Sequence, residues 1–184
     1  MNRTQVRAPR HAEIRQACIT DRPALAEFLS GLSPRARYLR FFSGAAPASQ
    51  AMLRILAGGA DYIDALVATE RGAIIGHAMA ADSAGPGGHL TEVGVVVADG
   101  HRGLGLGSAL MRLLIARAQA RGVTAVVMEV LAENRQVLTM ISDHWPGARQ
   151  EHSGPCLTIH ARLPAVPLPR PGQDRHGERL AAAR

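Results

Sequence analysis

The segment His101-Arg102-Gly103-Leu104-Gly105-Leu106-Gly107-Ser108 decides the fold, because it places three alternating glycines between an apolar segment and a helical one. Leu90–Ala98 reads as a strand buried on both faces, and apolar residues at helical spacing predict a helix over Leu104–Ala120. Glycine lets backbone N–H groups approach an anion closely. A helix start adds free N–H donors and a partial positive charge. The stretch from Leu90 to Gly122 therefore predicts a strand, a loop and a helix that bind a phosphate-bearing ligand.

The kind of phosphate ligand is narrowed by what this segment lacks. A P-loop needs a lysine before Ser or Thr, and the chain has no lysine. The dinucleotide fingerprint needs G-x-G-x-x-G, whereas this loop has G-x-G-x-G and its strand lies mid-chain after a hairpin. A tight turn that packs small residues is the structural alternative. Because three glycines cost conformational entropy, we favour a phosphate site assisted by Arg102 and Ser108.

Composition and charge predict one domain with two basic ends. The chain has 184 residues, 47% of them hydrophobic, which suffices for one full core. Residues 1–11 hold three arginines and no acid, and residues 164–184 hold four arginines against two acids. We therefore predict a domain over residues 12–163, a basic flexible N-terminus (1–11) and a disordered tail rich in Pro and Arg (164–184). With the net charge of +6 mostly at the ends, a specific nucleic-acid interface is disfavoured.

No pattern predicts a membrane, secreted or metal-binding protein. No apolar run approaches the roughly 18 residues that span a bilayer. The first eleven residues lack the apolar core of a signal peptide. Cys18 and Cys156 are far apart, and the eight histidines follow no metal-ligand spacing. We therefore expect a cytoplasmic protein without a metal or a membrane partner, either a monomer or a homodimer.

The remaining elements follow an order typical of a single mixed sheet. The expected order is a strand at 11–17, helices beginning near 20, 33 and 47, a hairpin at 64–70 and 73–81, a loop at 82–88, the strand, loop and helix above, a strand at 124–131, a helix at 133–144, and a closing hairpin at 148–152 and 155–163. On the long helix, Leu106, Leu110, Leu113 and Leu114 are expected to face the core. This order predicts an α/β (α+β) fold, a mixed and mostly antiparallel sheet with helices on both faces.

Four segments, in matching order, resemble the GNAT-type N-acetyltransferases. Arg102-x-x-Gly105-x-Gly107 is similar to the R/Q-x-x-G-x-G/A signature of that family, and Thr91–Val97 resembles its fourth strand. Glu133-Asn134-Arg135 resembles the start of its helix after the fifth strand. Leu32–Phe42, LSPRARYLRFF, resembles a segment of bacterial Pat-type protein lysine acetyltransferases. The resemblance covers about residues 12–163 and implies a sheet whose fourth and fifth strands splay apart.

The resemblance implies acetyl-CoA as the acyl donor. The backbone of the fourth strand would pair with the pantetheine arm, and the N–H groups of the glycine loop would hold the pyrophosphate. The implied cofactor-binding residues are Val95, Val96, Val97, Arg102, Gly103, Leu104, Gly105, Leu106, Gly107, Ser108 and Asn134.

Acetyl transfer to an amine needs a base, a stabilised oxyanion and a departing thiolate. Glu92 is the candidate base, because it is an acid among apolar residues in the strand beside the cofactor, where burial would tune it for proton transfer. Pat-type relatives carry a glutamate at the matching position. The alternative is a structural carboxylate bonded to Thr91 or to an arginine. A backbone N–H near Val95 is expected to stabilise the oxyanion.

The acid and the acceptor are less defined. Many family members carry a tyrosine in the helix that Asn134 begins, and this helix has none, which leaves Ser142 and His144 as weaker candidates for the acid. We expect an N-acetyltransferase in which a primary amine attacks directly, with Leu32–Phe42 favouring a protein lysine. A small-molecule amine acceptor and a non-catalytic acetyl-CoA sensor or partner-recruiting module remain as alternatives.

Overall fold

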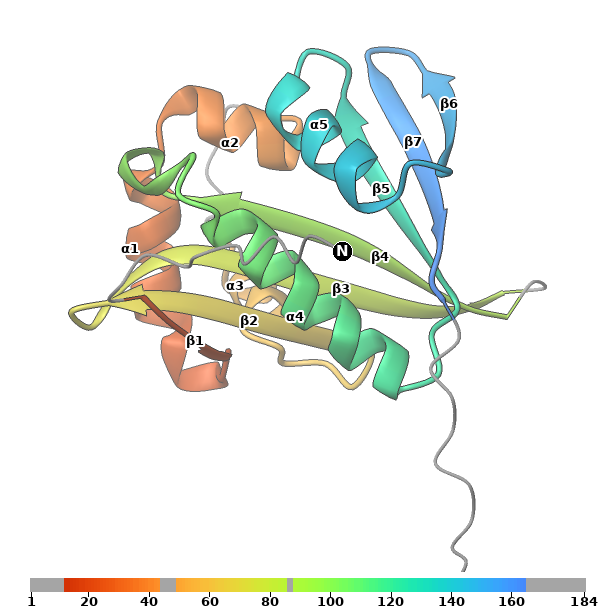
Figure 1. Cartoon of the computed structure of the whole chain (residues 1–184). Coiled ribbons are helices and arrows are strands. Elements are labelled where there is room, and N and C mark those ends of the chain that lie inside the picture. Colours follow the sequence, from red (N-terminus) through yellow and green to blue (C-terminus); the bar gives the residue numbers. More distant parts are fainter. Residues whose placement is uncertain (1–11, 44–48, 86–87, 165–184) are drawn as a thin grey trace, which may run out of the picture.

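The computed structural model describes residues 12–43, 49–85 and 88–164, and its centre is a seven-stranded sheet in the order β1-β2-β3-β4-β5-β7-β6 (Figure 1). Neighbouring strands are antiparallel except β4 and β5, which are parallel. The strands are β1 Glu13–Gln16, β2 Ile63–Glu70, β3 Ala73–Gly85, β4 Gly88–Val97, β5 Ala125–Leu131, β6 Arg149–Ser153 and β7 Cys156–Arg162. This topology confirms the expected mixed sheet. The expected N-terminus (1–11) and most of the expected tail lie outside the described residues.

Helices cover both faces of the sheet. The helices are α1 Arg22–Gly31, α2 Pro34–Phe41, α3 Gln50–Leu56, α4 Leu106–Ala120 and α5 Arg135–His144, with short 3-10 turns η1 Ile19–Asp21 and η2 Asp99–His101. One buried core joins α4 and α5 to the sheet, and a second joins α1, α2 and α3 to its other face. In Figure 1, α4 crosses the front of the sheet, and α2 lies beside the start of α5. No helix in the described part of the chain is long and apolar enough to cross a membrane.

Short polar side chains cap the starts of α2 and α5. Ser33 Oγ accepts a hydrogen bond from Ala36 N (3.1 Å), and Pro34 occupies the first turn of α2. Asn134 Oδ1 accepts a longer one from Val137 N (3.4 Å) at the start of α5. After α4, Gly122 has φ 88°, the left-handed conformation that favours glycine.

Two expectations about the elements are wrong. The loop expected at 82–88 is largely strand, because β3 continues to Gly85 and β4 begins at Gly88. There the polar side chains satisfy one another across the pair, with Thr91 Oγ1 donating to Asp82 Oδ1 (2.5 Å). Leu113 is 39% exposed rather than in the core, since Met111, Ile115 and Ala118 share the buried face of α4 instead.

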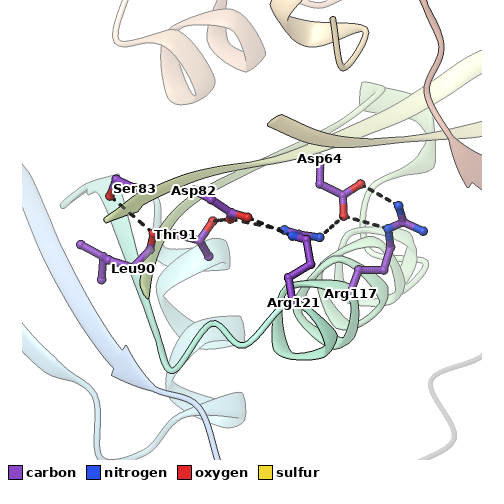
Figure 2. A network of polar contacts seen from close by, with 7 residues as sticks. All are labelled: Asp64, Asp82, Ser83, Leu90, Thr91, Arg117 and Arg121. Carbon is purple, nitrogen blue, oxygen red and sulfur yellow. Dashed lines mark hydrogen bonds and ion pairs between the residues drawn. The ribbon is translucent and has the colours of Figure 1, made fainter. Parts of the chain in front are cut away.

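A polar network fixes the C-terminal end of α4 to three strands (Figure 2). Asp64 on β2 is buried and accepts from Arg117 Nε (2.8 Å) and Arg121 Nη1 (2.5 Å). Arg121 Nε also donates to Asp82 Oδ2 (2.9 Å), which connects the helix through Asp82 to Thr91 on β4. Two arginines on a buried carboxylate hold the helix axis against the sheet.

The central strands β4 and β5 pair over only three residues. Their register runs from Leu90 opposite Ala125 to Glu92 opposite Val127, and pairing stops there. Beyond that point the two strands diverge (Figure 1). The splayed strands that the resemblance implied are therefore present, and Glu92 lies at the point where they separate.

Candidate functional site

The two faces of β4 look onto different helices. Val93 belongs to the core under α4, whereas Val96 belongs to the core under α1–α3. Because side chains alternate along a strand, Glu92, Gly94 and Val96 share one face, and Thr91 and Val93 share the other. We call these the α2 face and the α4 face of β4.

A cleft of about 710 Å³ opens where β4 ends and α4 begins. It is lined by the end of β4, the glycine loop, the first turn of α4, one side of α5 and part of α2. Among the expected cofactor-binding residues, those that line it are Val95, Val96, Val97, Arg102, Gly103, Gly105, Leu106, Gly107, Ser108 and Asn134. Leu104 is the exception, because its side chain is 51% exposed outside the cleft. Val95 and Val97 are only partly buried because the cleft opens beside them, so the expectation that β4 is buried on both faces is wrong.

The glycine loop has the backbone shape that an anion site needs. Gly103 (φ 74°) and Gly105 (φ 80°) are left-handed, which residues with a side chain rarely adopt. Gly105 is the N-cap of α4, and Ala109 N donates to Gly105 O (3.0 Å) in the first turn. The N–H groups that precede Ala109 in the helix therefore have no helical acceptor and are available to a ligand.

Side chains clamp the loop to its neighbours. Ser33 at the start of α2 donates to Asp99 through its backbone N (3.0 Å) and its Oγ (2.9 Å), and these bonds lower the pKa of the Asp99 carboxyl. Asp99 also lies 3.4 Å from the Arg102 guanidinium. On the other side, His101 Nε2 lies 3.2 Å from Glu70 Oε2. The start of α2 and the loop therefore form one wall of the cleft.

A second bridge connects α2 to the residue that precedes Asn134. Arg35 Nη1 on α2 lies 2.8 Å from Glu133 Oε1, just before α5. This ion pair is exposed at both ends, so it contributes little to stability, but it sets α2 beside α5. On α5, His144 lines the cleft with Nδ1 2.8 Å from Met140 O, whereas Ser142 is exposed and is not among the residues that line it.

Glu92 is exposed, so its expected burial is wrong. Glu92 pairs with Ala81 on β3 and Val127 on β5, so its side chain stands out from the α2 face, and no described element covers it there. Thr91, the partner of the structural alternative, points to the other face and donates to Asp82. The side chain of Glu92 is therefore accessible from solvent at the last residue pair of β4 and β5, although Glu92 is not among the residues that line the cleft or the gap between these strands.

Sequence reasoning missed two charged residues at this opening. Arg40 on α2 lines both the cleft and the gap between β4 and β5, and Glu129 on β5 lines the gap. Arg40 belongs to the segment LSPRARYLRFF, whose resemblance to Pat-type proteins indicates an acceptor class but no role for this arginine. The signal that could have indicated Glu129 is that it is the one acidic residue in the otherwise apolar strand AVVMEVL.

The α2 face also carries a buried histidine. His77 on β3 is 1% exposed, with Nε2 2.8 Å from Leu56 O. Burial, and then the charge of Arg40, lower its pKa to about 4. Burial likewise lowers the pKa of Arg40 to about 10, and the Glu92 carboxylate opposes that shift. At neutral pH the face therefore carries a charged Arg40 above a neutral His77.

A strand that opens into a cleft, a glycine loop at a helix start and splayed parallel strands define a class of acyl-CoA-binding acyltransferase. The profile of the Acetyltransferase (GNAT) family matches residues 36–141, more than half of the chain. The chain belongs to this family and is an acyltransferase of the acetyl-CoA-dependent N-acetylating kind. Sequence comparison with curated proteins gives no match. In the described residues, no group of three or more His, Cys, Asp or Glu is placed to hold a metal ion.

Solved structures support the fold assignment. The GNAT domain of S. lividans PAT superposes with a TM-score of 0.73 at 26% identity, over 83% of this chain and 90% of that one. Ribosomal-protein-alanine N-acetyltransferase from Brucella melitensis gives 0.66 at 22% identity, over 82% and 99%. PaiA N-acetyltransferase from Thermoplasma acidophilum, solved with coenzyme A, gives 0.63 at 15% identity, over 83% and 99%.

Proposed function

We propose that a primary amine attacks acetyl-CoA directly in this protein, with Glu92 as the base. The observation that carries the proposal is the position of Glu92, which is exposed at the last residue pair before β4 and β5 part, on the strand whose next residues line the cleft. A carboxylate there can take a proton from an amine that approaches on the α2 face. The acyl donor needs no reactive side chain of the protein, because its thioester carbonyl is itself the electrophile.

The residues of the cleft divide the binding of acetyl-CoA between them. The free N–H groups at the start of α4 fit a pyrophosphate, and Arg102 adds a positive charge beside them. The unpaired edge of β4 at Val95 and Val97 fits an extended pantetheine arm, as one strand pairs with another. A backbone N–H near Val95 then faces the acyl group and stabilises the oxyanion. Asn134 caps α5 and holds that helix against the cleft.

A protein lysine is the acceptor that we favour. Two features support it: the LSPRARYLRFF segment, and the similarity to the GNAT domain of S. lividans PAT. A small-molecule amine is the second acceptor class. One observation favours a non-catalytic acetyl-CoA sensor. The helix α5 has no tyrosine to act as the acid, and the buried residue that it places in the gap, Ile141, cannot donate a proton. A cytoplasmic location and a monomeric or homodimeric state stay predictions.

Release of CoA, measured with a thiol reagent, tests the proposal. The purified protein is incubated with acetyl-CoA and with lysine peptides, amino acids or polyamines, and each lysine peptide is matched by its norleucine counterpart. We expect release with a lysine peptide and none above hydrolysis with the norleucine control. Tight binding of acetyl-CoA by calorimetry without release for any amine would favour the sensor. Because the chain has no lysine, self-acetylation of side-chain amines cannot mimic activity.

A further inference from the structure

The guanidinium of Arg40 is packed flat against β4. A Cβ atom placed on Gly94 would lie 2.6 Å from Arg40 Cζ and 3.0 Å from its Nη1. Such contacts are too short for any real side chain, so glycine at position 94 is what leaves room for the guanidinium. Arg40 Cζ also lies over the Phe41 ring, 5.0 Å from its centroid. Arg40 is therefore held at one place on the α2 face.

The Arg40 side chain is half-buried, and one of its donors lacks a partner among the described residues. Arg40 Nε is enclosed by protein atoms and has no hydrogen-bond acceptor in the described part of the chain. Glu92 attracts the charge from a distance, but the ion pairs of the described residues include neither of them. Partly removing a guanidinium from water without a paired anion, and enclosing its Nε without an acceptor, is costly. A negative charge that arises only during function would compensate that cost.

The gap between β4 and β5 shows where that charge arises. Among the described residues that line the gap, Arg40 is the one basic side chain, and it stands directly on Gly94, next to Val95. In the proposed reaction, the negative charge that develops here is on the thioester oxygen, beside the Val95 N–H. A fixed cation in a site of low dielectric stabilises such a charge strongly.

We propose that Arg40 is a catalytic residue that donates a hydrogen bond to the acyl oxygen as the amine attacks. The proposal rests on the proposed function. The amine nitrogen forms a bond to the carbonyl carbon, and the C=O electron pair moves to oxygen, where the Arg40 guanidinium and the Val95 N–H hold it. Glu92 takes the amine proton. The electron pair on the oxyanion then re-forms the C=O bond and the C–S bond breaks. The electrons of that bond leave on the sulfur of CoA as a thiolate.

Kinetics of two Arg40 variants test this role. Arg40→Gln is expected to lower kcat about 100-fold, as loss of an oxyanion donor does. The KM for the amine and the Kd for acetyl-CoA stay within about threefold, because the interaction is made in the transition state. Arg40→Lys keeps a positive charge but not the planar fork, so we expect it to retain about a tenth of the wild-type kcat.

The matched control is Arg37→Gln on the same helix. Arg37 Nη1 donates to Leu32 O (2.8 Å) and Ser30 O (3.2 Å), so its loss weakens α2 away from the gap. We expect this control to lower the melting temperature while kcat changes less than threefold. Methylguanidine added to Arg40→Ala gives a further readout, because saturable recovery of kcat requires the cation at the reacting atoms.

The outcomes separate this proposal from the proposed function. Full kcat in Arg40→Gln with an active wild type overturns the role of Arg40 alone. A raised KM for the amine with unchanged kcat also overturns it, since Arg40 would then bind the acceptor. Equal losses of kcat in Arg40→Gln and Arg37→Gln, without rescue by methylguanidine, show a structural role. A wild type that acetylates no amine overturns the proposed function, and the role of Arg40 falls with it.

Discussion

The two faces of β4 differ in what builds them. The groups proposed to hold the cofactor in the cleft that β4 shares with α4 are mainly backbone: N–H groups at a helix start, two left-handed glycines and the edge of β4 beyond its pairing with β5. The α2 face is made of side chains, Glu92, Arg40 and His77, which come from three different elements. A ligand on the first side is held by main-chain geometry, whereas chemistry on the second depends on charge. Binding and turnover are therefore expected to fail separately.

The largest effect is expected from Glu92→Gln. Loss of a general base typically costs about 10²- to 10⁴-fold, and we expect kcat to fall at least about 100-fold. The Kd for acetyl-CoA should not change, because Glu92 lies on the α2 face and outside the cleft. Calorimetry and CoA release on the same preparation measure both quantities.

Glu129→Gln is the matched control, since it makes the same change on the facing strand. It should keep most of the activity. If Glu129→Gln loses activity and Glu92→Gln does not, the base is Glu129.

Acid should destabilise the fold through His77. Its pKa falls from 6.5 to about 4 on folding, so the folded state binds that proton less readily than the unfolded chain. The contribution of His77 to the unfolding free energy is fully present above pH 6.5 and is lost as the pH falls through 4. The loss amounts to at most about 3 kcal/mol. Urea unfolding at pH 7 and pH 4 measures the loss.

The control is His77→Gln, whose amide can still donate to Leu56 O. Subtracting its acid sensitivity removes the contributions of other groups, such as Asp21, whose pKa is lowered by the Arg15 guanidinium. Equal acid sensitivity of wild type and variant would show that His77 is not the titrating group.

Gly105→Val should damage the cleft and leave the α2 face intact. A β-branched residue at φ 80° is strained, and it moves the free N–H groups at the start of α4. We expect the Kd for acetyl-CoA to rise about tenfold or more, which corresponds to roughly 1.4 kcal/mol or more. Gly122→Ala introduces a side chain at a left-handed position (φ 88°) after the other end of α4, where nothing crowds it. It should lower stability without changing the Kd.

The smallest effect is expected from Asp64→Asn. This change removes the charge from the network that holds α4, at a cost of about 1–3 kcal/mol in unfolding free energy. Because the network lies at the far end of α4, we expect kcat and the Kd for acetyl-CoA to stay within about threefold. A loss of acetyl-CoA affinity far beyond the loss of stability would show that the network also shapes the loop.

The contrast between the glycine loop and the α2 face also explains which features the sequence predicted. The glycine loop, the helix that begins at Ser33-Pro34 and the order of the elements depend on local chemistry, and the structure has them where they were expected. The loop expected at 82–88 failed because pairing between β3 and β4 overrides the local preference of Gly and Pro for turns. The prediction that Leu113 faces the core was wrong because helical spacing does not reveal how wide the buried face of the helix is.

The α2 face was predictable only in part. Glu92 is a candidate because of its apolar neighbours in sequence, but the same neighbours led to the wrong expectation of burial, because burial depends on what covers the α2 face in the folded chain. Arg40 and Glu129 are separated from Glu92 by 52 and 37 positions in the chain. Their common location is a tertiary property, and no local pattern predicts it.

Direct attack by an amine is tested most directly by a single turnover followed by intact mass. The protein is mixed with one equivalent of acetyl-CoA, with or without an active amine, and both CoA and the chain are measured. We predict one equivalent of CoA for each acetylated amine, no release without the amine and no mass increase of the chain. Release of CoA before the amine is added, with an acetyl group on Cys18 or Cys156, would contradict direct attack.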